Sequence, residues 1–180
     1  MSKSYIWLVQ LINFLLYLSL QVAILQRMLP FYNPTCFVYI GYFLFLPWRK
    51  SNLIIQLVVG FLIGLTVDAF YNSIGIHAFA AVLVIYIRNY LLYILPPYAP
   101  NDNEYATRPT LANMGLKKYS VYSIILLFIY HTSVWYLHLW NNTFFFNTIP
   151  ELFLSIILSY LLIFVPQFIF TVLIGNTHIR

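Results

Sequence analysis

Histidines and carboxylates are the side chains of this sequence that suit acid–base or metal chemistry, and both are few. The 180 residues include four histidines, four acidic residues and a single cysteine. His131 and His138 are seven residues apart, or about 10 Å along a helix. Two imidazoles that far apart cannot bind one metal ion through ligand bonds of about 2.1 Å. The single cysteine, Cys36, excludes an internal disulfide and a multi-cysteine metal site.

Asp68 and Arg88 are charged residues inside apolar runs, which makes them the remaining candidates for chemistry. Helix rise separates them by roughly 13 Å in depth, so we expect no direct ion pair. The carboxylates are unpaired, no histidine stands at a fixed spacing from a nucleophile, and there is no glycine-rich phosphate loop. The sequence therefore predicts that the protein is not an enzyme and has no cofactor or metal.

The elements that position these residues follow from an extreme composition. Hydrophobic residues make up 62% of the chain and charged residues only 7%, whereas roughly a quarter of the residues in soluble domains are charged. This composition is typical of an integral membrane protein. The net charge of +5 is scattered between apolar runs and does not form the basic face that nucleic acid requires.

Six apolar runs approach the roughly 20 residues that a helix needs to cross a bilayer. They cover residues 5–25, 31–47, 53–70, 76–95, 119–140 and 150–174. Four prolines predict an extended or turn-rich loop over residues 96–118. The predicted fold class is an all-α integral membrane protein, with one six-helix transmembrane bundle over residues 1–180.

Basic residues orient the predicted bundle, because cytoplasmic loops of membrane proteins are rich in Lys and Arg. An even number of spans puts both termini on one side. Of the basic residues outside the predicted spans, only Arg27 lies on the side opposite the termini. On the side of the termini lie Lys3, Arg49, Lys50, Arg108, Lys117, Lys118 and Arg180. We therefore expect both termini, and the 96–118 loop, in the cytoplasm.

Small and polar residues recur on one face of two predicted helices. Such faces should contact protein. Lipid tails are as apolar as leucine, so helices in a membrane associate through close packing of small residues and through polar groups. In the first run the polar bundle face consists of Gln10, Asn13, Tyr17 and Gln21. In the third run the recurrence is every four residues, at Gln56, Gly60, Gly64 and Asp68. The glycine pair permits close approach, so this stripe is predicted to be a helix-packing interface or a groove for a partner.

Asp68 lies at the end of its predicted helix. There it either reaches headgroup water or caps the turn, or it accepts hydrogen bonds from the following loop or another helix. An aspartate at a helix C-terminus opposes the macrodipole, so we expect no stabilisation from that source. Burying the charged side chain of Arg88 in a membrane costs free energy unless the guanidinium has hydrogen-bond partners. We expect its partners to be helix-end carbonyls, or Gln and Asn side chains of the first run.

Residues 46–92 resemble the rod shape-determining MreD family. The resemblance rests on a proline after the second run, the pattern G-F-x-x-G-L-x-x-D within "VGFLIGLTVDAF", a glycine a few residues later, and an arginine in the following helix. Residues 119–174 also look like the C-terminal half of one MreD type. The motif positions in this sequence are Gly60, Gly64, Asp68, Gly75 and Arg88. The resemblance implies no catalytic residue.

The resemblance implies a structural role. MreD proteins are inner-membrane components of the bacterial cell-elongation machinery, with MreC, the actin-like MreB, the polymerase RodA and its penicillin-binding transpeptidase. The family fold is similar to the six-helix substrate-binding subunit of energy-coupling-factor transporters. We expect a non-enzymatic scaffold of cell shape and peptidoglycan synthesis, with MreC as the most direct partner, in contact with membrane lipid but not nucleic acid. The alternative is a transport subunit that binds a small ligand in a cavity lined by Gln10, Asn13, Tyr17 and Arg88.

Overall fold

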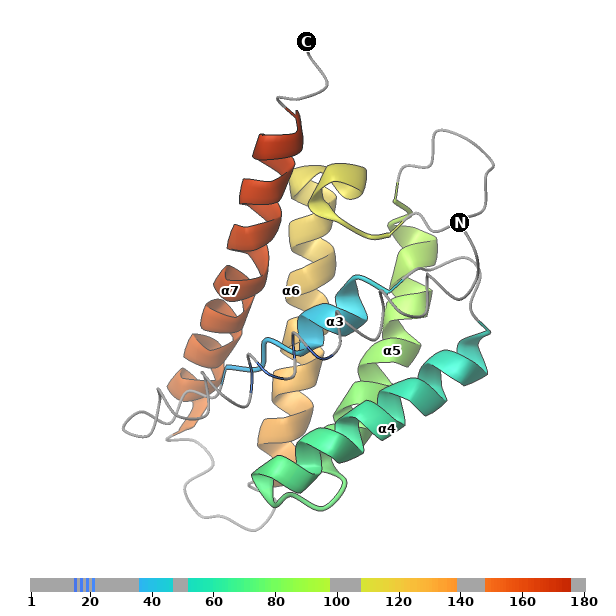
Figure 1. The fold of residues 1–180 in the computed structure, drawn as a ribbon. Coiled ribbons are helices and arrows are strands. Elements are labelled where there is room, and N and C mark those ends of the chain that lie inside the picture. Colours follow the sequence, from blue (N-terminus) through green and yellow to red (C-terminus); the bar gives the residue numbers. More distant parts are fainter. Residues whose placement is uncertain are drawn as a thin grey trace.

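The structure, a computed structural model, describes residues 15, 17, 19, 21, 36–46, 52–97, 108–138 and 148–175. The ordered elements within these residues are all helices (Figure 1). They are α3 (Ile40–Leu44), α4 (Leu53–Tyr71), α5 (Ile76–Ile94), α6 (Leu111–His138) and α7 (Ile149–Gly175).

Four of these helices are long and apolar enough to cross a membrane: α4, α5, α6 and the Ile149–Ile169 part of α7. The chain is therefore a helical, multi-pass membrane protein. The predicted spans 53–70 and 76–95 coincide with α4 and α5 to within one residue at each end. The described residues hold four such spans, whereas the sequence predicted six over the whole chain. Most of the predicted first span, including Gln10 and Asn13, lies outside the described residues.

Helix α6 begins at Leu111, so the prediction of a loop over 96–118 is wrong for residues 111–118. The last of the four prolines, Pro109, lies just before the helix and does not interrupt it. The carbonyl of Thr110 then accepts the first backbone bond, from Met114 at 2.9 Å. Gly115 has non-helical backbone angles, φ 71° and ψ 162°, and divides α6 into a short first turn and a long second part.

The second predicted span differs most from expectation. A continuous helix over 31–47 is wrong for residues 36–39, because Cys36 and Phe37 are irregular and Val38 and Tyr39 form a turn. Only the five residues of α3 are helical there. Irregular backbone at membrane depth is tolerated where it is buried in protein.

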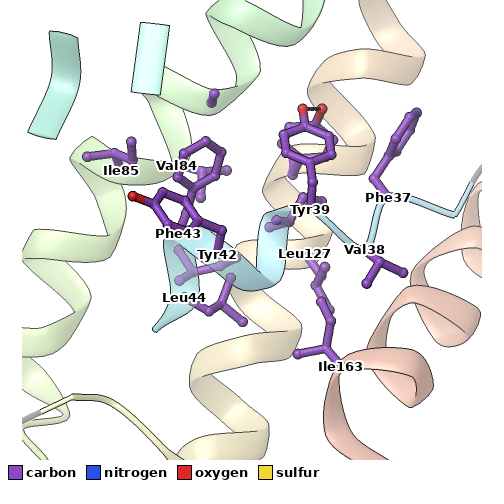
Figure 2. Close-up of a cluster of buried hydrophobic side chains, with 14 of the residues drawn as sticks. Phe37, Val38, Tyr39, Tyr42, Phe43, Leu44, Val84, Ile85, Leu127 and Ile163 are labelled. Carbon is purple, nitrogen blue, oxygen red and sulfur yellow. Dashed lines mark hydrogen bonds between the residues drawn. The ribbon is translucent and has the colours of Figure 1, made fainter. Parts of the chain in front are cut away.

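Sequential long helices pack against one another: α4 against α5, α5 against α6, and α6 against α7. The short helix α3 lies across the long helices in the view of Figure 1. Its side chains form one buried cluster with Val84 and Ile85 of α5, Leu127 of α6 and Ile163 of α7 (Figure 2). The segment from residue 36 to 46 is thus the centre of the core.

Candidate functional site

Asp68, one of the predicted site residues, is almost completely buried between the end of α4 and the start of α5, with 4% of its surface exposed. Its Oδ1 accepts hydrogen bonds from the Ser73 hydroxyl at 2.6 Å and from the backbone N–H of His77 at 3.0 Å. Its Oδ2 accepts from the backbone N–H of Ala78 at 3.0 Å. These two N–H groups belong to the first turn of α5, where an intrahelical partner is missing. Asp68 therefore caps α5 from the preceding helix.

This geometry corrects the expectation about the helix dipole. The carboxylate does oppose the macrodipole of α4, whose C-terminal end it occupies. It also faces the N-terminus of α5, where a negative charge is stabilised by roughly 0.3–1 kcal/mol, and by up to about 2 kcal/mol when partly buried. The expectation of no dipole stabilisation was wrong, because it considered only the helix that carries Asp68. The predicted hydrogen bonding to the following loop and to another helix is present.

The glycine stripe of α4 packs against α5. A Cβ atom placed on Gly64 would lie 2.4 Å from the Cα of Ala78, and one on Gly60 would lie 2.1 Å from Cδ1 of Ile85. Gln56 continues the same contact, because its Oε1 accepts from the Asn89 side chain at 3.0 Å. Of the two predicted roles, this stripe serves helix packing. The groove that it was expected to offer a partner is already filled by α5.

Gly75 has a different function in the same hairpin. It precedes α5 with a φ of +76°, a left-handed conformation that L-residues rarely adopt. A Cβ at this position would have no neighbour within 4 Å. The glycine is therefore required by the backbone conformation and not by lack of space.

Arg88 is fully buried and binds the C-terminal end of α3. Its Nη2 donates to the Leu46 carbonyl, and its Nε donates to the Tyr122 hydroxyl at 3.1 Å. That hydroxyl donates in turn to the Leu44 carbonyl at 2.9 Å. Helix-end carbonyls are thus partners of Arg88, as expected, and Asp68 is not among its contacts. Within the described part of the chain, Nη1 of Arg88 has no hydrogen-bond partner.

The irregular residues 36–38 are held by side chains that are distant in sequence. Gln21 donates to the Cys36 carbonyl and accepts from the backbone N–H of Val38, both at 2.8 Å. The N–H of Phe37 donates to the Ser159 hydroxyl of α7 at 3.1 Å. Buried backbone groups need such partners, since each unpaired group costs about 1–3 kcal/mol. These bonds explain why this segment is stable without being helical.

Two of the four residues predicted for the polar bundle face can be placed, and both face protein. Gln21 binds the irregular segment as described above. Tyr17 packs against α3, since a Cβ on Gly41 would lie 3.0 Å from a ring carbon of Tyr17. The other two, Gln10 and Asn13, lie outside the described residues.

Two of the histidines, His77 and His131, each lie within hydrogen-bond distance of a different hydroxyl group. His131 Nε2 lies 3.0 Å from the Ser159 hydroxyl. His77 Nδ1 lies 2.6 Å from the Tyr130 hydroxyl, which also bonds to the hydroxyl of Tyr39. Over the described residues, no group of three or more His, Cys, Asp or Glu side chains is arranged to hold a metal ion.

Sequence reasoning missed several residues of this network, among them Tyr39, Tyr122, Tyr130 and Phe37. The Phe37 ring packs edge-on against His77 and Tyr130, with centroid distances of 4.9 and 5.5 Å. Nothing in the sequence distinguishes these residues from the rest of the 16 Tyr and 16 Phe. Ser159 could have been identified from the sequence as a residue that faces protein, because it lies four residues after Ser155 and both are small residues on one helix face.

The site is therefore a buried polar network that joins α4, α5, α6 and α7 to the irregular segment. Its carboxylate, its guanidinium and two of its histidines are engaged in bonds within the chain. This arrangement positions helices in a multi-pass helical membrane protein. No known protein family, characterised protein or solved structure matches the chain.

Proposed function

We propose that this protein is a non-enzymatic membrane scaffold of the bacterial cell-elongation machinery, of the MreD type. The proposal rests on the resemblance of residues 46–92 and on what the motif residues do. Gly60, Gly64 and Asp68 join α4 to α5, Gly75 forms the turn between them, and Arg88 fixes the segment from residue 36 to 46. Residues that only build a bundle suit a scaffold better than a catalyst.

The proposal includes the remaining features of that family. The complete bundle would have six transmembrane helices with a fold similar to the substrate-binding subunit of energy-coupling-factor transporters. It would lie in the bacterial inner membrane with both termini in the cytoplasm. RodA, its penicillin-binding transpeptidase and MreB would belong to the same complex, and MreC would bind directly.

The observation that supports a direct membrane partner best is the exposed face of α5. The exposed large hydrophobic side chains of α4 and α7 are aliphatic or phenylalanine, as lipid contact requires. On α5 they include Tyr86, Tyr90 and Tyr93, which are 60%, 68% and 75% exposed. At 100° per residue these three lie within about 60° of each other, on the side of α5 opposite Arg88. We call this the tyrosine face.

Interfacial anchoring accounts for Tyr93 and Tyr90, because aromatic side chains collect at the headgroup level near helix ends. It does not account for Tyr86, which lies roughly 15 Å along a helix of about 28 Å. Helical side chains lean toward the N-terminus, so Tyr86 leans away from the nearer end of α5. Lipid tails offer its hydroxyl no acceptor. A transmembrane helix that brings acceptors fits this position, and MreC is the partner that the proposal assigns to it.

Co-purification with MreC tests this assignment. A Y86L/Y90L double variant keeps an apolar face but removes two hydroxyls and two rings, so we expect MreC to be lost. F61L is the matched control, because Phe61 is an exposed aromatic residue of α4. We expect F61L to retain MreC. Retention of MreC by Y86L/Y90L contradicts the assigned face, and failure of the unaltered protein to capture MreC contradicts the proposed function.

One observation favours the second candidate, a transport subunit that binds a small ligand. The Nη1 atom of Arg88 is buried without a partner among the described residues, and so is the Tyr119 hydroxyl. Unpaired buried donors are groups that a polar ligand can satisfy. A small molecule that co-purifies with the protein and is lost in an Arg88→Leu variant would favour this function over the scaffold.

A further inference from the structure

Three basic residues gather at the start of α6, at the end of the bundle opposite Asp68. Arg108 lies just before the helix, and Lys117 and Lys118 follow the break at Gly115, with both lysines exposed. The two carboxylates in the described part of the chain are elsewhere: Asp68 ends α4, and Glu151 starts α7. Helix α7 runs antiparallel to α6 (Figure 1), so neither of these two acids lies at this end of the bundle.

The local structure fixes the position of these cations. Leu111 and Met114 are buried and anchor the first turn of α6 to the core. The side chain of Asn113 donates to the Arg108 carbonyl at 2.9 Å and so holds the preceding backbone against this turn. After Gly115 the chain reaches the surface of the bundle at Leu116, which is 59% exposed, and the long part of α6 begins there. The lysines are therefore in the first turn of the membrane-crossing part of α6.

The register of α6 places Lys117 directly above a lipid-facing stripe. Val121, Ile124 and Phe128 are exposed and follow Lys117 at intervals of four, three and four residues, so all lie on one face. Lys118 stands seven residues before the exposed Ile125. A lipid whose tail lies along this stripe has its headgroup at the level of the two ammonium groups.

We propose that Lys117 and Lys118, with Leu116 and the Val121–Phe128 stripe, form a docking surface for one anionic phospholipid. The lysines bind the headgroup phosphate, and the stripe contacts the acyl chain. Charge complementarity selects an anionic lipid over a zwitterionic one. Two cations in the first turn of a helix oppose its macrodipole, and a bound phosphate offsets that repulsion. The surface depends on the membrane-spanning register of α6 and not on the proposed scaffold role.

Native mass spectrometry of the full-length protein in detergent tests the surface, with dioleoyl-phosphatidylglycerol and dioleoyl-phosphatidylcholine titrated separately. We expect tighter binding of phosphatidylglycerol. Each lysine contributes about fivefold, so a K117Q/K118Q variant should bind it about 25-fold more weakly. The matched K117R/K118R variant keeps both charges and should retain binding. Identical elution of the variants on size exclusion checks their folding.

Three outcomes would overturn the proposal. One is unchanged phosphatidylglycerol affinity in K117Q/K118Q, and another is equal affinity of the unaltered protein for both lipids. The third concerns the source of the phosphate. Displacement of phosphatidylglycerol by millimolar inorganic phosphate would mean that the lysines bind a free anion and that the apolar stripe contributes nothing.

Discussion

Removing the Asp68 carboxylate is the perturbation whose effect can be worked out most fully from the structure. An Asp68→Ala variant leaves the N–H groups of His77 and Ala78 and the hydroxyl of Ser73 without their acceptor. Losing a helix cap costs about 0.5–2 kcal/mol. A further buried donor left unpaired costs about 1–3 kcal/mol. Together these contributions should lower the free energy of unfolding of Asp68→Ala by about 1.5–5 kcal/mol.

Asp68→Asn separates the charge from the hydrogen bonds. One amide oxygen can still accept from Ser73 and His77, but the amide nitrogen then faces the N–H of Ala78, so one bond and the charge are lost. We expect a smaller loss, about 1–2 kcal/mol. Unfolding in mixed micelles titrated with sodium dodecyl sulfate measures both variants on one scale.

Glu151→Ala is the matched control, because Glu151 lies in the first turn of α7 and contributes its charge near a helix N-terminus. Its loss should cost about 0.3–1 kcal/mol. The reasoning about Asp68 is refuted if Asp68→Ala destabilises the protein by no more than Glu151→Ala does.

Four further variants test other contacts. Gly64→Leu should prevent the α4–α5 hairpin from packing and abolish recovery of folded protein, because even a Cβ added at Gly64 would lie 2.4 Å from the Cα of Ala78. Elution of this variant at the position of the unaltered protein would contradict this. Gly75→Ala should cost about 1 kcal/mol from its positive φ alone, and a neutral effect on thermal unfolding would show that the turn can relax. Tyr122→Phe should lower the free energy of unfolding by about 1–3 kcal/mol, because the Tyr122 hydroxyl donates to the Leu44 carbonyl. Tyr119→Phe should be neutral or stabilising, because the buried Tyr119 hydroxyl has no partner among the described residues. Equal effects of the two variants would refute the assigned bonds.

The sequence predicted α4 and α5 well, because a continuous apolar run of spanning length bounded by turn residues leaves few alternatives in a membrane. It also predicted that Gly60, Gly64 and Asp68 face protein. It did not predict which protein, because a small-residue stripe fits a helix of the same chain as well as a partner helix. The stripe is filled by α5, and the partner surface must be sought elsewhere.

The segment around α3 could not be predicted, because its conformation depends on residues far away in the sequence. Apolar length alone favours a helix over 31–47. The break at residues 36–39 is stabilised by Gln21 and by Ser159, which lies more than 100 positions later. The stabilisation of the Asp68 charge by a helix dipole was missed for a similar reason. Its stabilisation depends on the N-terminus of α5, which only the hairpin geometry brings to the carboxylate.

Site-specific crosslinking in living bacteria tests the central claim, a scaffold that binds MreC through the tyrosine face, most directly. The native Cys36 is buried and would be replaced by alanine, and single cysteines would then be placed as Y86C on α5 and as V58C on the exposed apolar face of α4. The account predicts that Y86C forms a crosslink to the transmembrane helix of MreC and that V58C does not. Crosslinking of MreC to V58C but not to Y86C, or to neither, would contradict it.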